Sequence, residues 1–436
     1  MPKPHTLTLR AYGVGFGDCF LLTFRYKDNI GDRHMLIDFG STQKPPKAGD
    51  KLMLDIANDI AKTVGDQLHV IVATHRHTDH MSGFATNPKG KGAGDIIASL
   101  NPELVIMPWT EKPGAPTEWK GPGKGRAAAV DDALRMSLDR MRAVAAVSVL
   151  EAKHVAKNLK SEIIFIGDDG LANESAVRNL AKMGKRKPAY VSYGQKIPLL
   201  KTLFPGVKFD VLGPPTVHQK KDLPNQSARN KDQFWHFASF WKLQAATSQL
   251  ASTGDPSIMF PRAKYFKLRD VPMEDRWFVR RVRDMRGSQL LRIVRSMDGA
   301  LNNTSVILLI EVGGKKFLFP GDAQWENWEF ALDKNLDTLK DVDVYKVGHH
   351  GSLNATPKKL WNNFAKRSPK TTDKNRLITV MSTRTDSKHG HPETQTEVPR
   401  ETLVTALRKL SKLRSTQELE DDNELVMKID FDLNLN

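Results

Sequence analysis

The sequence has a single cysteine, Cys19, among its 436 residues. One cysteine cannot form an intramolecular disulfide, and it excludes a metal site built from several thiolates. Cys19 stands in the apolar stretch DCFLLTF, where we expect it to be a small core residue.

Long apolar runs and an N-terminal targeting pattern are also missing. No stretch approaches the roughly 18 consecutive apolar residues of a membrane-spanning helix. The opening MPKPHTLTLRAY lacks a basic region followed by an apolar one. These absences predict a soluble protein of the cytoplasm, without a membrane as its partner.

Acidic residues are fewer than basic ones, since 50 Asp and Glu stand against 66 Lys and Arg and give a net charge of +16. This balance attracts anionic partners such as nucleic acid, although a generally basic surface without a specific partner would give the same count. Arginines are dense between residues 276 and 295, where Arg280, Arg281 and Arg283 are candidate substrate contacts. The alternative is a solvated helix face with interspersed acids. No protein partner can be named from the sequence.

The first hundred residues alternate between apolar strand-like segments and turn residues. The pattern predicts strands at 5–12, 19–26, 34–41 and 68–75, and apolar residues at helical spacing predict a helix at 51–64. The sequence therefore opens as a mixed α/β protein.

The composition changes at about residue 109, where Pro, Gly and Lys become frequent. We predict a single domain over residues 1–436 that carries an elaborated insertion at 109–300, whose strands partly belong to the main sheets. Strand patterns then return strongly. They predict a hairpin over 304–322 that turns at Gly313-Gly314, strands at 343–352 and 376–383, a helix at 401–414 and a final strand at 425–433.

The loop HRHTDH, residues 75–80, directly follows a predicted buried strand. His75 and His77 share one parity, so both can face the same point, and Asp79 and His80 follow where the chain turns into a helix. Neutral imidazole and carboxylate are the ligand types that suit zinc and related metals. Two such pairs predict two adjacent metal ions, and the alternative is a polar loop whose histidines are solvated or hydrogen-bonded.

The pattern HxHxDH after an apolar strand resembles the signature of the metallo-β-lactamase superfamily. The ordered motifs VGFGDCFLL, LIDFG, THRHTDHMSGF, NNTSVILL, LFPGDA, VYKVGHHGS and HGHP are similar to the hydrolase domain of ComEC-like competence proteins and to bacterial phosphorylcholine esterases. These stretches run from residue 13 to 392, and the insertion matches poorly. The resemblance implies a four-layer αββα sandwich with the metal site on loops at one edge of the two sheets.

The resemblance also implies two divalent cations, with zinc expected and manganese as the alternative. The first pair of the HRHTDH loop would bind one cation and the second pair the other. Asp322, at the end of LFPGD, would bridge them at the roughly 3.5–4 Å typical of two-metal hydrolases. Asp168 in GDDG is a rival, but Asp322 has the expected neighbours, NNTS before it and HHGS after it.

Later histidines would complete both sites. Much of the superfamily uses an intervening histidine, but His154 and His218 lie in no recognisable motif here. The phosphorylcholine-esterase pattern instead assigns His350 to the His75–His77 site and His391 to the Asp79–His80 site.

His349 would then face the cavity as an acid or as a donor to the developing anion, although an exchange of roles between His349 and His350 stays open. Asp38 would hydrogen bond to a metal-binding imidazole or to the ligand loop, or it is simply a turn-forming aspartate before glycine. His389 stands where the family usually has a tyrosine, and it is a spare polar group or a substrate contact. The implied catalytic set is Asp79, Asp322 and His349.

Two other chemistries fit poorly. GVGFGD loosely resembles a dinucleotide fingerprint, but Asp18 stands where the last glycine is needed and a strand follows instead of a helix, so we expect no nucleotide cofactor. Ser352 is better explained as a turn or helix-capping residue than as a nucleophile.

The predicted function is that of a binuclear metal-dependent hydrolase that uses a hydroxide held between two cations. Its substrate is predicted to be a phosphodiester, with nucleic acid leading. The alternative within enzymes is a small-molecule ester, lactone or amide. The alternative from another class is a non-catalytic module with the same fold that binds metal or nucleic acid.

Overall fold

The computed structural model describes residues 2–27, 30–65, 67–113, 174–220, 301–352, 356–384, 398–422 and 424–433, with the isolated positions 132, 135, 138 and 152. The chain divides into two compact units. Unit 1 consists of residues 1–113, 173–216 and 302–436, and unit 2 of residues 114–172 and 217–301. Every helix and strand named below belongs to unit 1. Residues 173–216, inside the predicted insertion, therefore belong to the unit that holds the sheets.

In the described part of unit 1, seven strands form the first sheet, in the order β13-β1-β2-β3-β4-β5-β6. The first four of these strands are antiparallel neighbours, whereas β3, β4, β5 and β6 run parallel. The strands are β1 (Pro4–Tyr12), β2 (Cys19–Tyr26), β3 (Arg33–Phe39), β4 (Val70–Val72), β5 (Leu104–Pro108), β6 (Ala189–Val191) and β13 (Val426–Asp432).

The second sheet has six strands within the described residues, in the order β12-β11-β10-β9-β8-β7. β8 and β9 form the predicted hairpin, whose turn places Gly313 and Gly314 at φ 54° and 71°. These left-handed angles suit glycine and match the twist of a tight hairpin. The strands are β7 (Lys208–Gly213), β8 (Ile307–Val312), β9 (Lys315–Phe319), β10 (Val344–Lys346), β11 (Ile378–Met381) and β12 (Lys412–Ser415).

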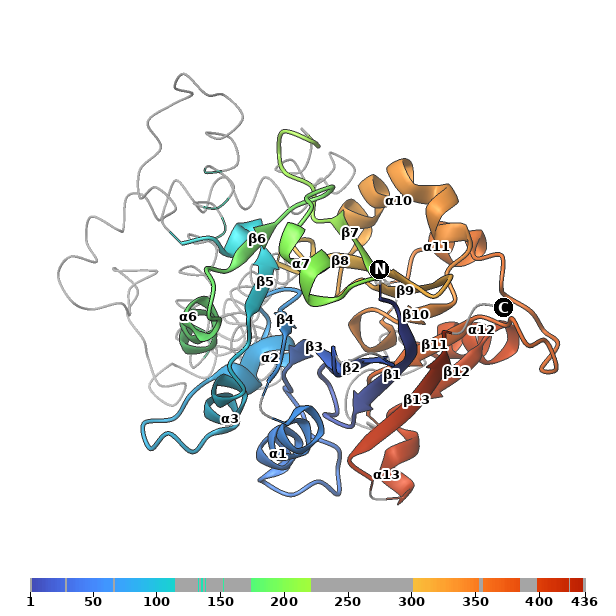
Figure 1. Ribbon diagram of the computed structural model, residues 1–436. Coiled ribbons are helices and arrows are strands. Elements are labelled where there is room, and N and C mark those ends of the chain that lie inside the picture. Colours follow the sequence, from blue (N-terminus) through green and yellow to red (C-terminus); the bar gives the residue numbers. More distant parts are fainter. Residues whose placement is uncertain are drawn as a thin grey trace, which may run out of the picture. The chain divides into compact units, whose positions relative to one another are not determined.

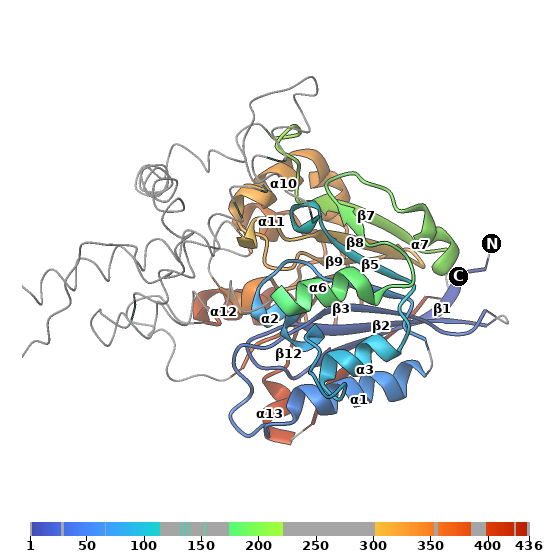
Figure 2. The ribbon, with the colours of Figure 1, turned by 90° about the vertical axis from the view of Figure 1, so that its left-hand side faces the viewer.

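Helices pack against the outer faces of both sheets (Figures 1 and 2). The first sheet is covered by α1, α3 and α6, and the second by α10, α11 and α12. The described helices are α1 (Leu52–Val64), α2 (Thr78–Met81), α3 (Ala93–Ser99), α6 (Glu174–Met183), α7 (Pro198–Leu203), α10 (Trp325–Lys340), α11 (Lys358–Asn363), α12 (Glu401–Leu410) and α13 (Glu418–Asp422), with 3-10 turns η1 (Ser82–Phe84), η2 (Trp109–Glu111) and η8 (His349–Gly351).

A continuous apolar core lies between the two sheets. Phe20 of β2 packs edge-on against Phe319 of β9, with ring centroids 5.9 Å apart, and both side chains are buried. Alternate residues of β1 and β8 enter the same core. Burial of one such large side chain contributes about 1.5–3 kcal/mol to folding. The fold is therefore a mixed α/β arrangement built on two mixed sheets.

Two predicted elements have different ends in the structure. The predicted helix 401–414 ends at Leu410, because residues 412–415 leave it to pair in parallel with β11 as the edge strand β12. The predicted strand 68–75 is shortened to Val70–Val72, since the chain beyond it turns toward the HRHTDH loop. No helix among the described residues is both long enough and apolar enough to cross a lipid bilayer.

Several strands end at one common edge. β3 runs parallel to β4, and β9 runs parallel to β10 and β11, so the carboxyl ends within each group point the same way. Asp38 lies near the end of β3, and the residues that follow these strands include the HRHTDH loop, Asp322, the HHG turn and Ser382. The carboxyl ends of parallel strands are a common place for binding sites.

Candidate metal centre

The HRHTDH loop connects β4 to the short helix α2. His77 is extended, with φ −62° and ψ 153°, and directly precedes the first turn of α2, which carries Asp79 and His80. The Nε2 atom of His75 lies 3.1 Å from Nδ1 of His77. The side chains of His75, His77, Asp79 and His80 are all buried. The loop therefore turns its ligand-type groups into the protein.

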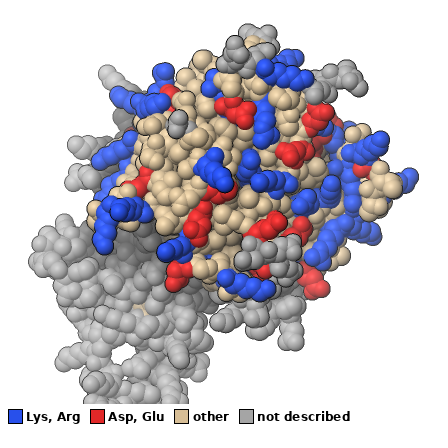
Figure 3. All heavy atoms as spheres, turned by 60° about the horizontal axis from the view of Figure 1, so that its bottom comes forward, with Lys and Arg blue, Asp and Glu red and all other residues tan. Residues whose placement is uncertain are grey.

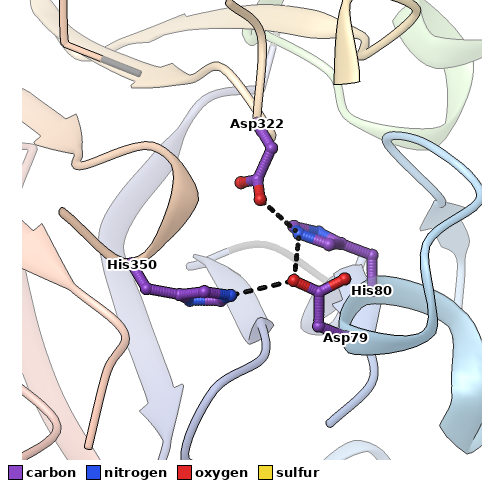
Figure 4. A group of neighbouring side chains, drawn as sticks. All are labelled: Asp79, His80, Asp322 and His350. Atoms are coloured by element: carbon purple, nitrogen blue, oxygen red, sulfur yellow. Dashed lines mark hydrogen bonds and ion pairs between the residues drawn. The ribbon is translucent and has the colours of Figure 1, made fainter. Parts of the chain in front are cut away.

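Asp79, His80, Asp322 and His350 converge in the first of three ligand groups among the described residues (Figure 4), of which the third is Asp18, Asp38 and His80. His350 Nε2 lies 2.9 Å from Asp79 Oδ2, and His80 Nε2 lies 3.5 Å from that oxygen. His80 Nε2 also lies 3.1 Å from Asp322 Oδ2. One ligand atom from each of the four residues lies within 4.8 Å of the others, so the group could hold a metal ion.

His75, His77 and Asp79 form the second group, again with ligand atoms within 4.8 Å of one another. Asp79 belongs to both groups. The two groups are therefore adjacent, and a carboxylate stands at their junction.

The donor set fits a cation. In the part of the chain that the structure describes, Asp79 Oδ1 is buried and accepts no hydrogen bond. A buried carboxylate oxygen without a partner is costly, and a metal ion would compensate it. The two carboxylates and the imidazoles are ligand types that zinc takes.

Burial opposes the charged forms of His80 and Asp322, but their charged neighbours outweigh it. For His80, the carboxylates of Asp322 and Asp79, with Asp38 and Asp18, outweigh burial and hold the pKa well above its usual value. Burial would raise the pKa of Asp322, but His80 and Lys346 outweigh it and hold that pKa well below its usual range. The surplus of carboxylates that retains a proton on His80 would equally favour a divalent cation in its place.

His75 and His77 have the opposite character. Burial, together with the neighbouring His80, lowers the pKa of both, so their imidazoles are neutral near pH 7. Neutral imidazole is the form that binds a metal.

Asp38 fixes both an imidazole and the ligand loop. Its Oδ2 lies 2.7 Å from His80 Nδ1, and its two oxygens accept hydrogen bonds from the backbone N–H and the hydroxyl of Thr74, each at 2.7 Å. Because Asp38 holds Nδ1, the Nε2 atom of His80 points toward Asp79 and Asp322. Asp38 thus sets the orientation of the ring.

His350 lies with Asp79, His80 and Asp322, whereas the family resemblance assigns it to the pair His75 and His77. Its φ of 53° reverses the chain after Gly348, and its Nδ1 lies 3.0 Å from the carbonyl oxygen of Ser382, which leaves Nε2 toward Asp79. A turn of this kind could not be read from the letters HHGS.

His349 is half-buried, and its backbone N–H donates to Asp322 Oδ1 at 2.8 Å. Its Nδ1 atom is buried and has no hydrogen-bond partner among the residues that the structure describes. Ser352 directly follows this turn. His218, the other histidine considered as a ligand, is exposed. Predictions at His391, His389, Arg280, Arg281, Arg283, His154 and Asp168 lie outside the described residues.

Sequence reasoning missed two buried charged residues beside the ligands, Asp18 and Lys346. The Nζ atom of Lys346 contacts Asp18 Oδ2 and lies 3.4 Å from Asp322 Oδ1. In the sequence, Asp18 stands out only as part of the glycine-rich turn GVGFGD. The signal that could have revealed the pair is a lysine inside a short apolar strand that leads directly into HHGS.

Comparisons with known proteins give no further assignment. No protein-family model matches the chain, and no curated protein sequence is significantly similar to it.

Proposed function

We propose that this protein is a metal-dependent hydrolase of the metallo-β-lactamase type. The observation that carries the proposal is the pair of adjacent buried ligand groups that share Asp79. Two facing sheets with helices on their outer faces agree with the four-layer αββα arrangement of that superfamily. The position of the ligands after the carboxyl ends of strands agrees with it as well.

Two divalent cations, with zinc first and manganese second, would be held by this chain. His75 and His77 would bind one, and Asp79, His80 and His350 the other. Asp322 would bind through Oδ2, the oxygen that faces His80. When bound, such cations lower the pKa of water toward about 7 and neutralise charge that develops on a substrate oxygen.

The remaining residues would position these groups and move a proton. Asp322 is held from two sides, because its own N–H donates to the hydroxyl of Ser305 at 3.2 Å and its Oδ1 accepts the N–H of His349. Asp38 orients His80. His349, beside the ligands, would protonate the leaving group from its Nδ1 atom.

We propose a phosphodiester as the substrate, with nucleic acid as the leading form. The chain carries a net charge of +16, which favours anionic molecules. On the face shown in Figure 3, Lys and Arg side chains are widespread, with Asp and Glu among them. Such a surface would attract a polyanion by many weak contacts, so its binding should weaken steeply as salt rises.

The test begins with metal content, measured by elemental analysis of the purified full-length protein. We expect about two equivalents of zinc or manganese, lost on Asp322→Asn. Asp333→Asn is the matched control, since this aspartate of α10 is 69% exposed and belongs to none of the ligand groups. A well-folded protein that takes up no metal would refute the proposal.

Activity is tested on a panel of single- and double-stranded DNA, RNA, a chromogenic phosphodiester, a phosphocholine ester, a lactone and a lactam. We expect hydrolysis of a phosphodiester that disappears with Asp322→Asn and persists with Asp333→Asn. Hydrolysis of only the lactone or lactam would contradict the proposed phosphodiester substrate but would still support a catalytic metal centre. Metal uptake without hydrolysis of any member would favour the binding module.

A further inference from the structure

Lys346 is a buried cation on β10, the strand that leads into the HHG turn. Its side chain is 2% exposed, and its Nζ atom lies between Asp18 and Asp322 and 3.4 Å from the carbonyl oxygen of Gly321. Its ion pairs with these two carboxylates compensate the buried ammonium group for the water that it loses. The residue is therefore an ammonium held by two carboxylates.

We infer that Lys346 is a positioning residue of the metal centre, which fixes the carboxylates around the ligands without touching the cations. The inference rests on the proposed function. Asp322 shows the effect most directly, because its two oxygens face different partners. Oδ1 accepts the N–H of His349 and faces Lys346, whereas Oδ2 faces His80 Nε2. One oxygen is thus committed to the protein, and the other stays open to a cation.

Lys346 also restrains Asp18, which would otherwise compete for His80. Asp38 Oδ2 lies 2.7 Å from His80 Nδ1, and Asp18 Oδ2 lies 3.6 Å from the same atom. The second distance is too long for a hydrogen bond. Because Lys346 contacts that oxygen of Asp18, Asp38 remains the partner of Nδ1, and the orientation of the His80 ring is kept.

The Lys346–Asp18 pair also joins the two sheets at the ligands. The backbone N–H of Asp18 donates to the carbonyl oxygen of Asp79 at 2.9 Å, and the carbonyl of Asp18 accepts the N–H of Gly40 at 3.1 Å. Lys346 belongs to the second sheet, and the HRHTDH loop follows a strand of the first. The ion pair therefore fixes the distance between the HRHTDH loop, which follows a strand of the first sheet, and the residues that follow β9 and β10 in the second.

The test uses the full chain with the double substitution Asp18→Asn and Lys346→Met, which removes both buried charges together. Replacing one partner alone leaves an uncompensated buried charge, whereas replacing a buried pair is often near neutral for stability. The matched control is Asp333→Asn with Lys334→Met, an exposed pair whose charged atoms lie 3.1 Å apart. Zinc affinity is measured by competition with a chromogenic chelator, and folding by the melting midpoint of the metal-free protein.

We expect the double variant to keep the metal-free melting midpoint and to bind zinc about 10–100-fold more weakly, as is typical when partners of metal ligands are removed. A folded double variant with wild-type zinc affinity would overturn the inference. If the double variant does not fold, Lys346→Arg alone, which keeps the charge but moves it relative to Asp18 and Asp322, is measured in its place with the same criterion. Failure of the proposed function looks different, because the wild-type protein would then show no zinc binding that Asp322→Asn weakens.

Discussion

Oδ2 of Asp38 lies 2.7 Å from Nδ1 of His80, and both side chains are buried. Asp38 accepts hydrogen bonds from Thr74 as well, so its carboxylate serves several donors at once. In Asp38→Asn the amide NH₂ would face a group of Thr74 or His80 that now hydrogen bonds to the carboxylate. The negative charge beside His80 would also be lost. Asparagine tolerates the φ of 57° at this position, so the backbone should persist. We expect zinc affinity about 10–100-fold weaker in a chelator competition. Unchanged affinity would show that Asp38 is only a turn residue.

The neighbours His349 and His350 should respond differently to alanine. His350→Ala removes a proposed ligand, so zinc should be lost on dialysis. His349→Ala keeps the backbone N–H that binds Asp322, so zinc affinity should stay within a few-fold while turnover falls by about 10²–10⁴. Metal content and kcat of the two variants decide the matter, and the reverse pattern would exchange their roles.

His34 and His69 predict a loss of stability in acid. They lie at the start of β3 and just before β4, and burial lowers the pKa of His34 to about 3 and of His69 to about 4. In the unfolded chain both titrate near pH 6.5. The unfolded state therefore binds protons at pH values where the folded state does not, and stability falls as pH drops from about 6.5 toward 4, by about 1.4 kcal/mol per pH unit for each histidine.

Urea unfolding of the metal-free protein at several pH values measures this loss. His69→Gln should flatten the fall between pH 6.5 and 4, whereas His218→Gln, at an exposed histidine, should leave it as in the wild type. Equal pH profiles for all three proteins would mean that the buried pair does not control the acid response.

Gly40 should not accept a side chain. A Cβ atom at this position would lie 2.5 Å from the backbone of Asp79 and His80, which is far inside contact distance. Gly40→Ala must therefore displace α2, at a cost of about 1–3 kcal/mol and with weaker zinc binding. Gly49→Ala is the matched control, because a Cβ there meets nothing within 4 Å. Melting midpoints and zinc titrations of both variants test the prediction, which fails if Gly40→Ala matches the control.

Local patterns were enough to predict much of this protein. The hairpin at Gly313-Gly314, the strand before HRHTDH and the proximity of His75 and His77 follow from residue periodicity and spacing. What depends on the meeting of distant segments was not predictable. The grouping of His350 with Asp79 follows from a positive φ, and the Asp18–Lys346 pair joins residues 328 positions apart (346 minus 18). The helix expected to reach residue 414 ends at Leu410 because pairing with β11 outweighs its amphipathic pattern.

Phe319, whose ring packs against that of Phe20, lies only three residues before Asp322 along the chain. The apolar contact between the sheets therefore contributes, together with the Lys346–Asp18 ion pair, to the distance between Asp322 and the HRHTDH loop. Any repacking of that contact should alter which cation fits, because ions with strict geometry tolerate little misplacement. The cation preference of the proposed metal centre should then depend in part on these two phenylalanines.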